Sequence, residues 1–384
     1  MATIKFRHFI QPDVIMSIDA VRLLSLLAPY KEYFVRRGLV FPEAPQTFID
    51  CTKLSTILAD PDEQVPSQMV EALYFISAIA NSKAMDGLVA AAKAAHPEMV
   101  FDMNASDTDI VVQVWLEDPG LVAKNHAASL INKPKSFEYH LNREHRPQTF
   151  LMPSPEKIQA IENTMSNWFG KNRRGRNCRI LTADHGNKIS FLIRHGKPMQ
   201  RHTAIKNEES ETICYRPEVF DVVFYDRSQN ELGIRTAGTK GERNLYRETL
   251  GFHLFDYYDY FNEQRKFTLN PLEMDGIHSL VCSDIDGLEQ VTLTAIKNSL
   301  DEGCNGHDLH TANDIFLSLL KQNRSMPPAS AMTMAVFSMK LSGVKNPRSL
   351  TIRPPNCVMY HRDEDSIVID QWLSKRGFIN SMDR

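Results

Sequence analysis

One short stretch of the chain, residues 220–252, carries residue types that could support metal-dependent hydrolysis. Its pattern predicts a strand at 220–225, a tight turn, a second strand at 232–237 and a helix at 244–254. Asp221 lies at the start of the first strand, and Glu231 and Lys240 flank the second. Two carboxylates can hold a divalent cation while an amine orients the attacking water. These three residues are therefore candidate catalytic residues, and Mg²⁺ is the one cofactor they would need.

This order of elements resembles the core of the PD-(D/E)xK nucleases, in which an Asp at a strand start and a Glu-x-Lys on the next strand converge on a metal ion. The resemblance implies a Glu near Arg235 and a Lys near Ala237, and neither is present. Glu231 and Lys240 do not have the spacing of one strand face. Three interpretations stay open: a nuclease with an irregular site that includes Asp226, a metal-free binding fold of nuclease shape, and an ordinary hairpin followed by a helix.

Basic residues concentrate between positions 143 and 206. This segment contains 13 Lys and Arg but only 4 Asp and Glu, which gives it a local charge of +9 in a chain of net charge −3. Six of them are candidates for phosphate contact: Arg173, Arg174, Arg176, Arg179, Arg194 and Lys197. Arg suits bidentate phosphate contacts. The alternative is that some of these cations satisfy a helix C-terminus and the others are solvated. We predict that they gather on one face that binds phosphates or an acidic partner.

Residues 191–198, FLIRHGKP, resemble the strand and loop that open the histidine phosphatases. The resemblance implies that His195 takes a phosphoryl group, that Arg194 steadies it, and that a late histidine such as His361 assists. Here, however, the motif ends a predicted hairpin and leads into a polar stretch instead of a helix. The other interpretation is that these are basic residues on the surface of a hairpin.

The helices and strands that the sequence predicts around these residues indicate an α+β fold. We expect a helical N-terminal domain, then a mixed, mainly antiparallel sheet with packed helices. Apolar spacing predicts helices within 14–35, 66–79 and 107–116, and Ser154-Pro155-Glu156 is typical of a helix start. Alternating patterns predict hairpins at 178–194 and 220–237, then strands at 278–282, 290–295, 332–340 and 349–353, with helices at 308–321 and 365–375. We divide the chain into a helical domain at 1–170, an α+β domain at 171–262 and a C-terminal α+β domain at 263–384.

Composition excludes several classes of protein. The six cysteines form no CxxC pair and have no His at zinc-finger spacing, so we expect reduced thiols and no structural metal. No apolar run approaches 18 residues, and the N-terminus is charged, so we expect a cytoplasmic protein without membrane contact. No P-loop, dinucleotide fingerprint or nucleophile elbow occurs.

These observations favour a non-catalytic, nucleic-acid-associated subunit or adaptor of a bacterial multi-protein system, with phage defence as a hypothetical setting. The alternatives are the divalent-metal nuclease described above and a protein-interaction scaffold. The scaffold would use the aromatic residues of 255–261, where Tyr257 and Tyr258 are central. Nucleic acid and other protein subunits are the expected partners, and self-association stays open.

Overall fold

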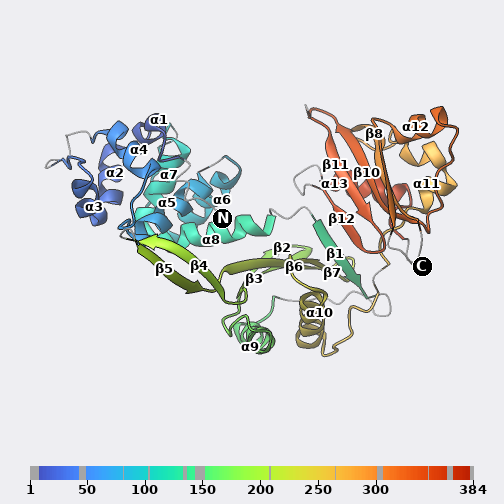
Figure 1. Cartoon of the computed structure of the whole chain (residues 1–384), viewed down its shortest axis with the longest axis horizontal. Coiled ribbons are helices and arrows are strands. Elements are labelled where there is room, and N and C mark those ends of the chain that lie inside the picture. The colour runs from blue at the N-terminus through green and yellow to red at the C-terminus, as the bar shows by residue number, and fades with distance from the viewer. Residues whose placement is uncertain are drawn as a thin grey trace. The chain divides into compact units, whose positions relative to one another are not determined.

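The computed structural model describes residues 8–42, 49–80, 82–102, 104–132, 136–142, 152–206, 209–263, 265–300, 306–344, 346–360 and 366–380. The fold is α+β, as the sequence predicts. It divides into two compact units (Figure 1). The first comprises Met1–Leu130 with Ala204–Glu211, and the second comprises Ile131–Thr203 with Thr212–Arg384. His361, the late histidine considered above, and Cys304, one of the six cysteines, lie outside the described residues.

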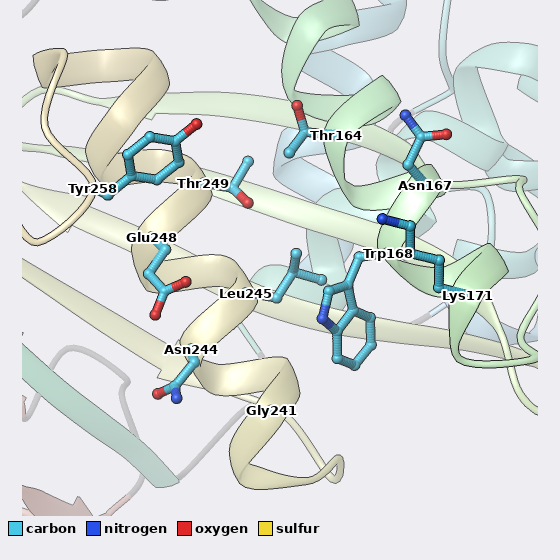
Figure 2. Close-up of a pocket in the computed structure, with 10 residues that line it drawn as sticks. All are labelled: Thr164, Asn167, Trp168, Lys171, Gly241, Asn244, Leu245, Glu248, Thr249 and Tyr258. Carbon is cyan, nitrogen blue, oxygen red and sulfur yellow. The ribbon is translucent and has the colours of Figure 1, made fainter.

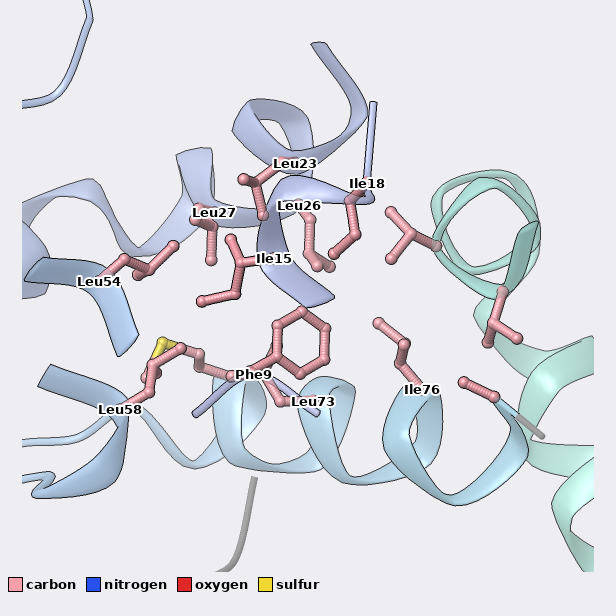
Figure 3. Close-up of a cluster of buried hydrophobic side chains, with 14 of the residues drawn as sticks. Phe9, Ile15, Ile18, Leu23, Leu26, Leu27, Leu54, Leu58, Leu73 and Ile76 are labelled. Carbon is pink, nitrogen blue, oxygen red and sulfur yellow. The ribbon is translucent and has the colours of Figure 1, made fainter. Parts of the chain in front are cut away.

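The first unit is helical. Its helices are α1 (Pro12–Met16), α2 (Ala20–Leu27), α3 (Lys31–Arg36), α4 (Cys51–Ala59), α5 (Ser67–Ile79), α6 (Ser82–Ala95) and α7 (Asp107–Glu117), and α8 (Pro119–Asn132) ends just beyond the boundary. Asp19 explains why the predicted helix at 14–35 is broken, because its carboxylate accepts hydrogen bonds from the backbone N–H groups of Val21 and Arg22 and so starts α2. Phe9, Ile15 and Ile76 meet in the apolar core (Figure 3).

A ten-stranded sheet organises the second unit, in the order β2-β3-β6-β7-β1-β12-β11-β10-β8-β9, with every neighbouring pair antiparallel. The strands are β1 (Ser136–Leu141), β2 (Arg179–His185), β3 (Lys188–Gly196), β6 (Glu218–Asp226), β7 (Glu231–Arg235), β8 (Leu288–Ser299), β9 (His307–Thr311), β10 (Met332–Leu341), β11 (Arg348–Arg353) and β12 (Cys357–Met359). A separate two-stranded sheet pairs β4 (Gln200–Lys206) with β5 (Glu209–Tyr215). This one sheet runs through both regions that the sequence analysis separates at residue 262.

Two helices, α9 (Pro155–Lys171) and α10 (Lys240–Phe255), cover one face of the β2-β3-β6-β7 half of the sheet (Figure 1). Ser154 caps α9 as predicted, because its hydroxyl accepts a hydrogen bond from the backbone N–H of Lys157. Ile193, Val223 and Tyr246 belong to the core between these helices and the strands. Both α9 and β1 belong to the second unit, although the sequence analysis assigned them to the helical domain.

The other half of the sheet carries α11 (Asn270–Met274), α12 (Ile315–Lys321) and α13 (Ser366–Lys375). Trp372 of α13 is fully buried against Phe337 of β10, with ring centroids 5.4 Å apart. Two predictions are wrong here. The expected strand at 278–282 is replaced by a 3₁₀ helix, Gly276–Leu280, and the expected helix at 308–321 is divided into β9 and α12.

Among the described residues, no helix is both long enough and apolar enough to span a membrane. The five cysteines within the described residues are free thiols.

Candidate functional site

The predicted catalytic residues Asp221, Glu231 and Lys240 do not converge. Asp226 pairs with Glu231 in the β6–β7 register, so those two side chains share a sheet face, and Asp221, five residues before Asp226, points to the opposite face. Glu231 is instead held by Lys266, whose Nζ lies 2.6 Å from both carboxylate oxygens. Lys240 is exposed at the start of α10. The irregular nuclease site expected from the sequence is therefore not formed by these residues.

Asp226 has a local structural role. Its Oδ1 accepts hydrogen bonds from the hydroxyl and backbone N–H of Ser228 and from the backbone N–H of Gln229. These bonds shape the turn between β6 and β7, and Asn230, with φ of 49°, completes it. Asp226 thus stabilises the hairpin and does not join Asp221.

Asp221 belongs to a buried polar network between the sheet and the helices. Its Oδ2 accepts a hydrogen bond from the Tyr246 hydroxyl at 2.6 Å and lies 3.0 Å from His195 Nε2. The other ring nitrogen of His195 lies 3.1 Å from the Gly196 carbonyl oxygen, and Phe169 stacks on the imidazole at 4.2 Å. Burial, and then the Asp221 carboxylate, raise the pKa of Tyr246 well above its usual value, so Tyr246 stays a donor.

Because His195 is only 2% exposed and is covered by Phe169, it is not a surface residue of the hairpin. A phosphoryl group cannot reach its ring without displacing the core. The structure therefore does not support the phosphoryl-accepting role that the resemblance to histidine phosphatases implies.

Glu242 of α10 extends this network to the end of α9. Its carboxylate pairs with the Arg174 guanidinium, at 2.5 Å from Nη1 and 3.0 Å from Nη2. The same carboxylate accepts a hydrogen bond from the backbone N–H of Thr239, and the Thr239 side chain completes a capping box at the start of α10. The sequence signal for this role is the Thr-x-x-Glu pattern, which our sequence analysis did not use.

His195, Asp221 and Glu242 offer ligand atoms within 4.8 Å of one another, a spacing that a metal ion could accept. The hydrogen-bond partners that these ligand atoms already have argue against a metal ion at this place. The Arg174 guanidinium already occupies both oxygens of Glu242, and one oxygen of Asp221 already faces the Tyr246 hydroxyl and the His195 ring. A metal ion would have to displace the Arg174 guanidinium from Glu242 inside the core, so these residues do not fit Mg²⁺.

Three of the six predicted phosphate-binding residues pair with carboxylates of the chain. Arg174 is held by Glu242, the Arg179 guanidinium lies 3.3 Å from Glu162, and Arg194 Nε lies 3.5 Å from Glu218. Arg174 is the most enclosed of the three, with 16% of its side chain exposed. Its role is to anchor the turn after α9, which is a correction to the sequence analysis.

The other three, Arg173, Arg176 and Lys197, are exposed, and none pairs with a carboxylate among the described residues. Arg216, which the sequence analysis missed, joins them by donating a hydrogen bond from Nη1 to the Arg173 carbonyl oxygen. We call these four residues the cationic turn.

Close backbone packing holds the segments of the cationic turn together. A Cβ at Gly196 would lie 2.7 Å from the Arg174 carbonyl oxygen, so only glycine allows β3 to approach the turn this closely. The backbone N–H of Lys197 donates to the Pro217 carbonyl oxygen at 2.8 Å. Cations from three separate segments are therefore collected at one place.

A groove of about 550 Å³ lies between α9 and α10 (Figure 2). It is lined by Thr164, Asn167, Trp168, Lys171, Gly241, Asn244, Leu245, Glu248, Thr249 and Tyr258. On each helix the lining residues recur at three- and four-residue spacing, which places them on one helix face. Lys171, the last residue of α9, connects this groove to the cationic turn.

The aromatic stretch at 255–261 divides between core and surface. Tyr260 and Phe261 are buried, and Phe255 stacks on Tyr260 with centroids 3.9 Å apart. Tyr257 and Tyr258 are 52% and 57% exposed. Of the aromatic residues in this stretch, only Tyr257 and Tyr258 are exposed enough to meet a partner, and Tyr258 also lines the groove.

No protein-family model matches the chain, and no curated protein matches its sequence.

Proposed function

We propose that this protein is a non-catalytic nucleic-acid-binding subunit that contacts phosphates through the cationic turn. The observation that carries the proposal is the collection of Arg173, Arg176, Lys197 and Arg216 around one turn, without a carboxylate partner among the described residues. Cations that the protein does not neutralise are available to replace the counterions of a phosphate backbone. Three of the four are Arg, whose planar guanidinium matches phosphate geometry.

The buried network supports this proposal by fixing the turn. Arg174 lies between Arg173 and Gly175 in sequence, and its pairing with buried Glu242 holds the turn against α10. A fixed backbone lowers the conformational entropy that the neighbouring cations would lose on binding. The paired Arg174 therefore positions the cations and makes no phosphate contact itself.

The salt dependence of oligonucleotide binding tests the proposal. The variant Arg173→Ala/Arg176→Ala/Lys197→Ala should reduce the slope of log K against log salt by about 2 for a single strand, because each lost phosphate contact contributes about 0.7. A matched control, Lys157→Ala/Lys321→Ala/Arg324→Ala, removes three cations elsewhere in the second unit and should leave the slope close to that of the unmodified protein. No binding at low salt, or equal slopes for both variants, would exclude the cationic turn as the phosphate site.

A protein partner is the second proposal, and the exposure of Tyr257 favours it. Exposed tyrosines are enriched at the centres of protein interfaces. Co-purification from the native host should recover another subunit, and Tyr257→Ala should lose it. The bacterial defence setting stays a prediction that the identity of such a subunit would test.

A further inference from the structure

The α9–α10 groove has one cationic end. The two helices run antiparallel: a Cβ at Gly241, at the start of α10, would lie 3.4 Å from the Trp168 indole, whereas Oγ1 of Thr164, earlier in α9, lies 2.9 Å from Nε2 of His253, near the end of α10. Lys171 and the first turn of α10 therefore flank the same end, next to the cationic turn. A phosphate backbone held by that turn would lie close to this end of the groove, because Lys171 lines the groove and is two residues from Arg173.

The groove offers an aromatic surface. Trp168 is partly exposed and lies between α9 and α10, facing Leu245 (Figure 2). Tyr258, at the other end of the groove, stacks on Phe252 with centroids 4.2 Å apart and is 57% exposed. An unpaired base can stack on such rings, because every base has a π face.

Polar groups beside these rings can read the edge of a base. The side-chain amides of Asn167 and Asn244 have no hydrogen-bond partner among the described residues. Glu248 accepts one bond, from Arg247 at 3.3 Å, and 46% of its side chain is exposed. A carboxylate only accepts hydrogen bonds, so it pairs with an exocyclic amine and repels a carbonyl oxygen.

We propose that the α9–α10 groove binds one unpaired base of a single-stranded nucleic acid and favours a base with an exocyclic amine, such as cytosine, over thymine. Trp168 provides the stacking surface, and Glu248 accepts a hydrogen bond from the amine. This inference rests on the proposed nucleic-acid binding and adds the kind of strand and the kind of base to it.

Tryptophan fluorescence and affinity for oligo(dC) and oligo(dT) of about 12 nucleotides test the groove. Oligo(dC) should bind about tenfold more tightly than oligo(dT), and it should quench the fluorescence of Trp168. The chain has three tryptophans, and Trp372 is fully buried, so Trp168→Phe should lose the quenching while binding oligo(dC) more tightly than Trp168→Ala, and Trp115→Phe should keep both binding and quenching. Trp168→Ala should weaken binding of oligo(dC) about tenfold or more.

The variant Glu248→Gln tests the base preference without removing the groove. It should make the affinities for oligo(dC) and oligo(dT) nearly equal, because an amide can donate to a carbonyl oxygen as well as accept from an amine. Asp259→Asn is the matched control: it removes one negative charge from another carboxylate bound to Arg247, outside the groove, and should keep the preference.

The outcomes separate the two proposals. If both oligonucleotides bind equally, the cationic-turn variant weakens them, and Trp168 is not quenched, the groove does not bind a base while the phosphate site stands. If neither oligonucleotide binds at low salt, both proposals fail. If Glu248→Gln and Asp259→Asn show the same preference for oligo(dC) over oligo(dT), the assignment of Glu248 is overturned.

Discussion

At the scale of single residues, the pairing of Arg174 with Glu242 decides which cations can meet a partner. Glu242 is fully buried, and its carboxylate neutralises Arg174 while it caps α10. Arg173 and Arg176, on either side of Arg174 and Gly175, stay exposed to solvent. Neighbouring residues of the same type thus have opposite roles, because one side chain enters the core and the others do not.

Removing one partner of this pair should cost far more stability than removing an exposed partner. Arg174→Ala should lower the free energy of unfolding by about 3–5 kcal/mol, because the Glu242 carboxylate then stays buried without its cation. Arg194→Ala is the matched control, since the side chains of Arg194 and its partner Glu218 are 46% and 55% exposed, and it should cost at most about 1 kcal/mol. Urea unfolding followed by tryptophan fluorescence measures both. Equal losses would show that the buried pair contributes no more than a surface pair.

His140 of β1 should make the stability depend on pH. Burial, helped by Arg247 and Arg243, lowers the pKa of His140 from 6.5 to about 4, and neither ring nitrogen has a hydrogen-bond partner among the residues that the structure describes. Below pH 6.5 the unfolded chain binds a proton at this residue that the folded chain does not, so stability falls as pH decreases towards 4.

Between pH 7 and pH 5 this difference at His140 is worth about 2 kcal/mol. His140→Leu removes the titrating group, so the variant should lose less stability than the unmodified protein over this interval. Chemical unfolding at both pH values gives the comparison. The same loss in both proteins would mean that other groups cause it.

At the scale of secondary-structure elements, the turns and helix starts that depend on local spacing and turn chemistry are predicted well from the sequence. The hairpin around Gly186, the hairpin after Asp226 and the start of α9 at Ser154 all occur where their residues predict them. Each depends on side chains within a few residues of the turn or cap. These elements position β3, the α9 C-terminus and therefore the cationic turn.

Strands, ion pairs and grooves that depend on contacts between residues far apart in the sequence are predicted poorly from it. The short segment HDLHT at 307–311 has no strong strand pattern, yet it becomes β9 because β8 pairs with it. The Arg174–Glu242 pair joins residues 68 positions apart, so charge counting cannot separate Arg174 from Arg173. The groove escaped prediction for the same reason, since its two walls come from α9 and α10 and only their packing brings Trp168 beside Gly241.

At the scale of the whole molecule, β1 joins the two halves of the large sheet. It pairs with β7 on one side and β12 on the other, and it is the only strand in the described sheet order that connects the helix-covered half to the β8–β12 half. Among the described elements, the one before β1 in the chain is helix α8 and the one after it is helix α9. A six-residue strand thus couples regions that are more than 100 residues apart in sequence.

Tyr139→Pro should therefore uncouple the two halves of the sheet. Proline lacks the backbone N–H that Tyr139 donates to the Asn356 carbonyl oxygen at 2.9 Å, and its ring disturbs a central strand. We expect calorimetry to show an additional transition, because two cores joined by an intact sheet unfold together and two uncoupled cores do not.

Tyr139→Phe is the control, because it keeps the backbone N–H and the aromatic ring that contacts Phe224 and Phe267. It should unfold like the unmodified protein. If Tyr139→Pro also unfolds with the same number of transitions, contacts outside β1, such as the pairing of Lys266 with Glu231 of β7, are sufficient to couple the halves. A separate transition would instead identify β1 as the element through which a ligand on the α9–α10 side could change the stability of the β8–β12 side.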